Sequence, residues 1–114
     1  MLPEDRNVAL VLDMLQFLGE VDDYTAGLSY DSYVNSKEKR RSVERVMELV
    51  GEAASQLSER FRADHPEVRW RDIVGLRHVL AHGYGRLDQA RLWRVVANDV
   101  PELRQMLESI LSRQ

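Results

Sequence analysis

Residues 77 to 84 hold four side chains that can act on a phosphodiester: the guanidinium of Arg77, the imidazoles of His78 and His82, and the phenol of Tyr84. Imidazole titrates near neutral pH, so it can take the proton from the 2′-hydroxyl of RNA or protonate the leaving 5′-oxygen. A guanidinium stabilises the negative charge that gathers on the phosphate in the transition state. This set of groups suits cleavage of RNA without a metal ion.

Three other interpretations of the two histidines stay open. A His-x-x-x-His pair at helical spacing can hold a metal ion, and the nearest further ligands in the sequence are Asp72 and Asp88. The imidazoles can instead be hydrogen-bonded core groups, which is the ordinary role of an isolated histidine. The segment can also bind an anion or a nucleotide without cleaving anything.

Helical geometry limits how these side chains meet. At about 100° per residue, Arg77 and Tyr84 lie on nearly the same face, whereas His82 lies about 140° from Arg77 and shares a face with His78. An undistorted helix therefore does not direct Arg77 and His82 at one target. Either the helix loosens near Gly83, or a second copy of the segment completes the site, and we predict a homodimer whose interface includes this helix.

The first half of the chain has the periodicity of two long helices. Residues 4–22 predict an amphipathic helix, and residues 24–35 predict a loop with one short turn near 30–34. Ser36 is the predicted N-cap of a second long helix, which must end before Pro66. The expected stripes are Val8, Val11, Leu12, Leu15, Leu18 and Val21 in the first helix, and Val43, Val46, Met47, Val50, Ala53, Ala54, Leu57 and Phe61 in the second.

The second half predicts further helices and no strand. A third main helix begins within residues 67–73 and should end or fray at the glycines beside Tyr84. Asp88 is the predicted cap of a short helix, and Pro101 opens the last one. Sustained alternation with β-branched residues is missing from the sequence. We therefore expect an all-α, up-and-down bundle of four main helices plus one or two short ones, forming a single domain over residues 1–114.

Charge is distributed unevenly along the chain. The net charge is −3 over 114 residues, but residues 1–36 carry seven acids and one arginine, a balance of −6. Residues 59–94 carry eight arginines against five acids, a balance of +3. The guanidinium fork of arginine suits phosphate, although pairing with local acids would also account for these residues. The balance of this segment is compatible with a nucleic-acid partner and does not require one.

The amino-acid composition indicates in which part of the cell we expect the protein to work. The sequence has 44% hydrophobic and 31% charged residues, typical of a globular protein, and no cysteine for disulfides or thiolate metal sites. No apolar run approaches the roughly 18 residues that a membrane span needs, and the N-terminus lacks the pattern of a secretory signal. We expect a cytoplasmic protein with no membrane partner.

The motif segment also resembles a known family. Arg77-His78-Val79-Leu80-Ala81-His82-Gly83-Tyr84 is similar to the signature of the HepT-like branch of the HEPN superfamily. Val50-Gly51-Glu52-Ala53-Ala54 resembles the family's segment on the long helix, and Pro66 to Arg71 resembles the start of its motif helix. Trp93 stands where the family has a tryptophan. The likeness covers nearly the whole chain, with His78 in place of the asparagine often found there.

The resemblance implies a specific system. Such proteins are helical, usually dimeric, and many are metal-independent endoribonucleases, with Arg77 and His82 as the catalytic residues and His78 in support. They are the toxins of type VII-like toxin–antitoxin pairs, encoded beside a minimal nucleotidyltransferase antitoxin. That enzyme can transfer AMP from ATP to the motif tyrosine, here Tyr84. The RNase reaction itself would need no cofactor, since ATP and Mg²⁺ belong to the partner.

Two further hypotheses follow from the same residues. The chain can be a non-catalytic module that binds a nucleotide or substrate for a nucleotidyltransferase. It can also be a small scaffold whose motif only shapes its dimer interface. Cleavage of RNA that depends on His82 would separate the ribonuclease from both.

Overall fold

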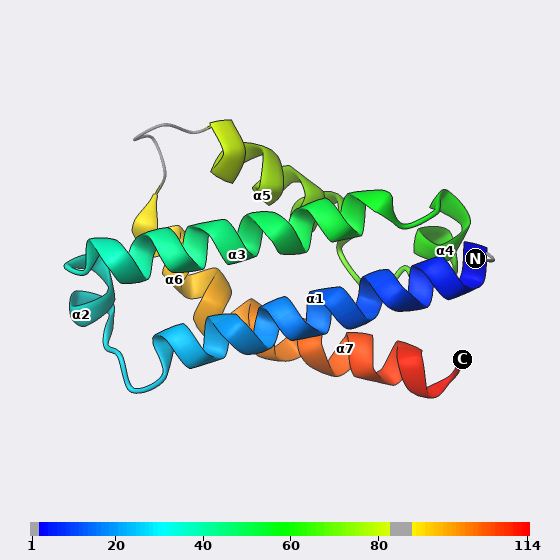
Figure 1. The fold of residues 1–114 in the computed structure, drawn as a ribbon, viewed down its shortest axis with the longest axis horizontal. Coiled ribbons are helices and arrows are strands. Elements are labelled where there is room, and N and C mark those ends of the chain that lie inside the picture. The colour runs from blue at the N-terminus through cyan, green and yellow to red at the C-terminus, as the bar shows by residue number, and fades with distance from the viewer. Residues whose placement is uncertain (1–2, 83–87) are drawn as a thin grey trace.

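The computed structural model describes residues 3–82 and 88–114, and the regular secondary structure of this part of the chain is all helical, without a strand (Figure 1). The predicted all-α class is confirmed there. The longer helices are α1 (Pro3–Thr25), α3 (Lys37–Gln56), α5 (Trp70–His82) and α7 (Val100–Ser112). The shorter elements are α2 (Tyr30–Val34), α4 (Glu59–Asp64), α6 (Gln89–Arg94) and the π-helical segment η1 (Val95–Asp99). Among the described helices, none is long and apolar enough to cross a membrane.

Helix α3 lies at the centre of the arrangement. It packs along α1 on one side and along α5 on another, and α7 lies against α1 (Figure 1). Helix α6 and η1 lead directly into α7. Within residues 3–82 and 88–114, no comparable contact joins α5 to α6, η1 or α7. The helix that carries the motif is therefore supported mainly by α3.

The start and the core of α3 agree with the sequence prediction. The side chain of Ser36 caps the helix, because its Oγ accepts a hydrogen bond from the backbone N–H of Lys39 at 3.2 Å. The predicted stripe is buried at every position. Its members are Val43, Val46, Met47, Val50, Ala53, Ala54, Leu57 and Phe61. This stripe forms the part of the core shared by α1, α3 and α5.

The predicted second helix is wrong in one respect, since its stripe is divided between two helices. Helix α3 ends at Gln56, and α4 begins at Glu59 after Ser58 has taken an extended conformation. Ser58 Oγ accepts from the N–H of Phe61 at 3.1 Å. The buried side chain of Asn7 accepts from the Ser58 N–H at 3.1 Å and donates to its Oγ at 3.2 Å. These bonds satisfy the groups that a continuous helix would have paired internally.

The register of α1 also differs from the prediction. The predicted buried stripe includes Leu12, but 53% of this residue is exposed. Leu10 and Met14 are buried instead, together with Val11 and Leu18. Helix α1 contacts α3 and α7 through a narrower seam than a general amphipathic stripe, so one apolar position falls outside it.

The two predicted C-terminal helices form one run. Asp88 caps α6 as expected, with its Oδ1 accepting from the N–H of Arg91 at 3.1 Å. Pro101 lies in the first turn of α7, also as expected, but no loop precedes it. The π-helical segment η1 joins the two, and the N–H of Val100 reaches the carbonyl of Val95, five residues back. This wider helical turn continues the helix up to Pro101 without a break.

Tyr33 ties α2, α3 and α6 together. Its buried hydroxyl donates to Gln89 Oε1 at 2.7 Å, and Gln89 Nε2 donates to Glu44 Oε2 at 2.7 Å. Its ring packs on Trp93 with centroids 4.9 Å apart. Burial, reinforced by the negative charge of Glu44, raises the pKa of Tyr33 to about 12. Gln89 is the first residue of α6, so this network fixes where α6 begins.

We expect the network to make stability depend on pH in alkaline solution. The folded state favours the neutral phenol, so its contribution is complete below the unfolded pKa near 10 and is lost as the pH rises through about 12. The free energy of unfolding of wild type should exceed that of Tyr33→Phe near pH 8. This gap should narrow by roughly 1–3 kcal/mol by about pH 12. Urea unfolding across this range measures both proteins, and a gap independent of pH would contradict the assignment.

Candidate functional site

Arg77 lies where α5 packs tightly against α3. A Cβ atom added to Gly51 of α3 would lie 2.9 Å from the carbonyl oxygen of Ile73 and closer still to the Cβ of Arg77. The two helices can approach this far only because position 51 has no side chain. The root of the half-buried Arg77 side chain is thus pressed against the α3 backbone. In the sequence, Gly51 is recognisable only as part of a family segment, although a glycine within an apolar helical stripe is a signal of close packing.

The other motif residues lie elsewhere or outside the described region. His78 is exposed, one position around the helix from Arg77. His82 closes α5 as the structure describes it, but only its backbone is described. Tyr84 and the glycines on either side of it lie outside the described residues. The prediction that these glycines end the helix therefore stays a prediction.

Helix α5 runs without interruption from Trp70 to His82. The helix therefore does not loosen between Arg77 and His82, and position 82 lies about 140° around the axis from position 77. Position 77 faces α3, as its contact with Gly51 shows. The described part of one chain consequently leaves the two predicted catalytic positions on different sides of α5.

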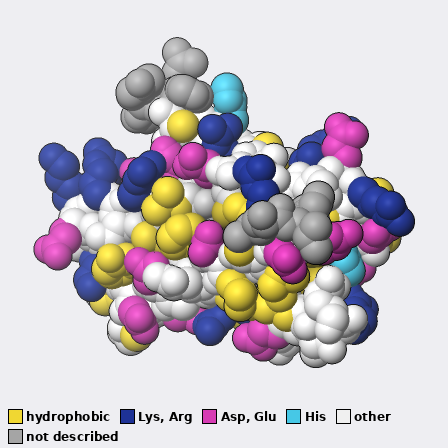
Figure 2. Space-filling model, turned by 45° about the vertical axis from the view of Figure 1, so that its right-hand side comes forward, with side chains coloured by type: hydrophobic (Ala, Val, Ile, Leu, Met, Phe, Trp, Pro, Cys, Tyr) yellow, Lys and Arg dark blue, Asp and Glu magenta, His cyan; other side chains and the backbone are white. Residues whose placement is uncertain are grey.

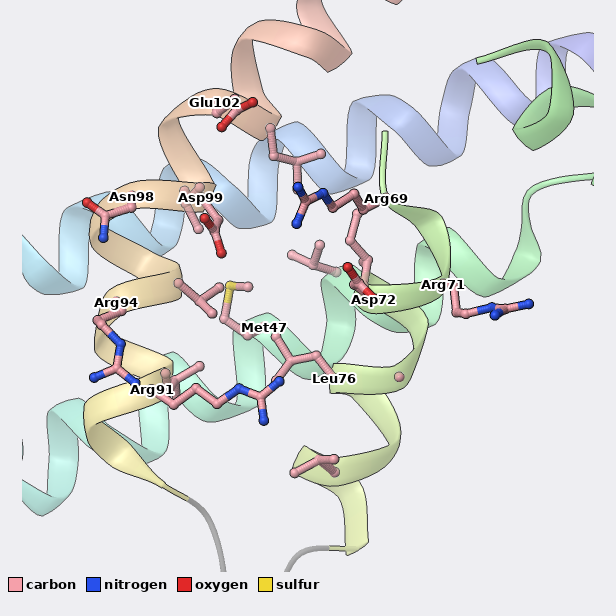
Figure 3. A pocket seen from close by; sticks show the side chains of 18 of the residues that line it. Met47, Arg69, Arg71, Asp72, Leu76, Arg91, Arg94, Asn98, Asp99 and Glu102 are labelled. Carbon is pink, nitrogen blue, oxygen red and sulfur yellow. The ribbon is translucent and has the colours of Figure 1, made fainter. Parts of the chain in front are cut away.

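A groove of about 1000 Å³ lies between α5 and the α6–η1–α7 run (Figure 3). Apolar side chains from α3, α5 and η1 form its floor, among them Met47, Leu76 and Val95. Arginines and acids stand along its edges. The charged and polar edge residues are Glu67, Arg69, Arg71, Asp72, Asp88, Arg91, Arg94, Asn98, Asp99 and Glu102. No pattern in the sequence indicates this groove, because it depends on the distance between α5 and α6.

Most of the described arginines in residues 59–94 form no ion pair with a nearby acid. Of the eight, Arg60 lies 4.0 Å from Asp64. In the described residues, the side chains of Arg69, Arg71, Arg91 and Arg94 have no ion pair or hydrogen bond within the chain. Elsewhere arginines and acids lie side by side, as much of the face in Figure 2 shows. Among the described arginines of this segment, pairing with neighbours thus accounts for Arg60 alone and leaves the groove arginines available.

The described side chains contain no group of three histidines, cysteines or acids that could hold a metal ion. The side chain of His82 is not among those described. The metal interpretation of the His78 and His82 pair is therefore neither supported nor tested by the part of the pair that is described.

The fold and the motif define a class: small all-helical proteins that carry Arg and His, five residues apart, on one helix. A family model described as "Ribonuclease HepT-like" matches residues 14–110, from within α1 to near the end of α7. The match includes Arg77, His78, His82 and Tyr84. The chain belongs to this family, a branch of the HEPN superfamily, as the sequence resemblance predicted.

Individual relatives agree in length and in the names they carry. A protein of Methanocaldococcus jannaschii named "Putative RNase" is 34% identical over 102 residues, covering 90% of this chain and 94% of the relative. A protein of Thermococcus cleftensis named "Probable ribonuclease HepT" is 28% identical and covers 86% of this chain and 89% of the relative. One of Caldanaerobacter subterraneus, also named "Putative RNase", is 31% identical over 77% of this chain and 79% of the relative. No solved structure matches the chain significantly.

The contact at Gly51 can be tested by adding one methyl group. We expect Gly51→Ala to force α5 away from α3 and to lower the free energy of unfolding by roughly 1–3 kcal/mol, although alanine favours a helix. Thermal or urea unfolding measures the change. Gly75→Ala is the matched control in α5, because a Cβ there would meet nothing within 4 Å. It should leave stability unchanged or raise it by up to about 1 kcal/mol. Equal effects from the two substitutions would contradict a close contact at Gly51.

Proposed function

We propose that this protein is a metal-independent endoribonuclease and the toxin of a type VII-like toxin–antitoxin pair. The observation that carries the proposal is the intact Arg77-to-His82 motif on α5 in a chain of the ribonuclease HepT-like family. Imidazole supplies the proton transfers, and the Arg77 guanidinium stabilises the charge on the phosphate. The exposed His78 assists beside them, and RNA is the substrate.

The active form in this proposal is a homodimer of up-and-down bundles. The support is the angle of about 140° between positions 77 and 82 on an unbroken helix, which one chain does not overcome within residues 70–82. Two copies of α5 along one cleft would allow Arg77 of one chain to act with His82 of its partner. In this arrangement, a separated chain lacks a complete site.

Regulation in the proposal acts on Tyr84. A minimal nucleotidyltransferase antitoxin, using ATP and Mg²⁺ in the cytoplasm, transfers AMP to the tyrosine hydroxyl. The bond from the α-phosphorus to the tyrosine oxygen forms as the bond to pyrophosphate breaks. Each added phosphate carries negative charge, so near Arg77 it would compete with the phosphate of RNA.

Subunit mixing tests both the reaction and the shared site. We expect the purified protein to cleave RNA in the presence of EDTA, and Arg77→Ala and His82→Ala each to reduce the rate by at least about 100-fold. Mixed after unfolding and refolding together, the two variants should recover about a quarter of wild-type activity, since random pairing yields one intact site in half of the dimers.

The controls separate the possible failures. Each variant refolded alone should stay inactive while light scattering shows a dimer. Mixing without recovery would mean that each chain builds its own site, and the composite site would be wrong. Wild type that binds RNA or a nucleotide without cleaving it would favour the non-catalytic binding module instead.

Tyr84→Phe tests the regulation. Phenylalanine keeps the ring and removes the acceptor oxygen, so RNA cleavage should persist while modification is lost. Incubation with the partner enzyme, ATP and Mg²⁺ should add the mass of AMP to wild type alone, and only wild type should be inactivated. An equal mass increase on the variant would show that another residue is the acceptor.

A further inference from the structure

The first turns of α3 hold the densest cluster of cations in the sequence. Residues 37–41 place four lysines and arginines in five positions, and Arg45 follows one turn later. Residues 37–45 thus carry five cations against two acids, Glu38 and Glu44, a balance of +3 in a chain whose net charge is −3. Figure 2 shows Lys and Arg side chains gathered at the end of the molecule where α3 begins. A polyanion would find there a local attraction that the chain as a whole does not offer.

Three of these cations form a row along one side of α3. Lys37, Arg41 and Arg45 are four residues apart, so they follow one another at about 6 Å along the helix axis and turn by only about 40° at each step. All three are exposed. Lys39 lies on another side of the helix, where its Nζ is 5.8 Å from the centre of the Tyr24 ring of α1. We call Lys37, Arg41 and Arg45 the α3 basic row.

Two acids orient the arginines of the row. Arg41 donates to Glu44 at 2.9 Å, and Arg45 donates to Glu48 at 2.9 Å. The side chains of the two acids are only 16% and 19% exposed, whereas those of the arginines are 61% and 64% exposed. A guanidinium has five N–H donors, so a bond to one acid leaves other donors for a second anion. The arginines are therefore held in place and can still bind a phosphate.

The row lies beside the contact between α3 and the motif helix. Helix α5 runs toward the end of the molecule at which α3 begins (Figure 1). Arg45 is six residues before Gly51, the residue that contacts Arg77, which corresponds to about 9 Å along α3. Around the axis of α3, Lys37 and Arg41 lie about 40° and 80° from Gly51. The row consequently flanks the side of α3 that faces α5.

The row is also joined to the start of α6. Glu44, the acid that holds Arg41, accepts a second hydrogen bond from Gln89, the first residue of α6. Five residues separate His82, at the end of α5, from Asp88, which caps α6, so these two lie no more than roughly 20 Å apart. One short RNA strand can therefore reach from the motif to the row.

We propose that the α3 basic row binds backbone phosphates of an RNA strand whose scissile phosphate lies at Arg77 and His82. The inference rests on the proposed ribonuclease and adds to it a site that sets affinity for RNA, not the rate of the chemical step. The groove beside α5 offers no such attraction, because five acids and four arginines line it. Phosphate contacts carry no information on the bases, so the row acts on RNA of any sequence that is long enough to reach it.

Removal of two charges tests the site by binding, in a His82→Ala background that prevents cleavage. Arg41→Gln with Arg45→Gln, the row variant, should weaken binding of a single strand of about 20 nucleotides roughly tenfold at low salt. The slope of log Kd against log salt concentration should fall by about 1.4, since each phosphate contact on a single strand contributes about 0.7.

The matched control removes two arginines from ion pairs at the other end of the molecule. Arg60 pairs with Asp64 and Arg113 with Glu67, so Arg60→Gln with Arg113→Gln changes the net charge by the same amount. This control should change affinity by less than about twofold. Equal losses from the two double variants would mean that net charge alone governs binding. That result, or unchanged RNA binding by the row variant, would overturn the proposal.

A single substitution covers the case in which the row variant does not fold. Within residues 3–82 and 88–114, Lys37 has no ion pair or side-chain hydrogen bond, so Lys37→Gln removes no such interaction. It should lower the salt slope by about 0.7, whereas Lys39→Gln, on another side of α3, should leave the slope unchanged. Circular dichroism confirms that both are helical. Equal slopes for these two variants would overturn the assignment of the row.

Cleavage separates this site from the proposed reaction. With His82 intact, the row variant should raise KM for the long oligoribonucleotide about tenfold and leave kcat within about twofold of wild type. On a dinucleotide, which is too short to reach the row, it should match wild type. A lower kcat on both substrates, or unchanged cleavage of both, would overturn the site and leave the ribonuclease standing. An inactive wild type whose RNA binding still depends on the row would overturn the ribonuclease and leave the site standing.

Discussion

The approach of α5 to α3 at Gly51 is the contact on which the rest of the site depends. Only a residue without a side chain lets the Ile73 carbonyl and the Arg77 Cβ come so near to the α3 backbone. The stem of Arg77 is fixed by this contact, because its Cβ cannot move without moving α5. The C-terminal half of α5 has no comparable contact with α6, η1 or α7 in the described chain. A change at Gly51 would therefore displace the whole motif helix relative to the core.

Because α5 packs mainly against α3, another face of this helix remains at the surface of the molecule. A helix held mainly by α3 leaves part of its opposite face uncovered, and Val79 is exposed there. The groove beside that face retains arginines and acids that do not pair within the chain. Arg41, Arg45 and Arg60 instead pair with acids three or four residues away, and such exposed ion pairs contribute little to stability. An apolar floor with arginines along its edge has a composition that is common in protein interfaces.

Local sequence signals predicted the elements well where the decisive contacts are local. The Ser36 and Asp88 caps and the buried stripe of α3 each depend on residues within a few positions. Predictions failed where distant residues decide. Helix α3 breaks before Ser58 because Asn7, far away in sequence, completes its hydrogen bonds. The motif residues were likewise recognisable by type and spacing. The contact of Arg77 with Gly51 and the charged edge of the groove could not be recognised in the sequence. Both depend on how α5 crosses α3 and on its distance from α6.

The geometry of α5 links these features to function. Position 77 faces the chain's own core, and position 82 lies on the side of the helix that Gly75 opens to other molecules. Arginine needs a rigid base to hold a guanidinium at a phosphate, and the Gly51 contact supplies one. A histidine that acts with the arginine of another chain must instead lie at the surface of its own chain, where the partner can reach it. In the proposed dimer, α5 meets both requirements, because one of its faces packs on α3 and the other faces the partner chain. Activity then depends on protein concentration, since dissociation separates each arginine from the histidine that completes its site.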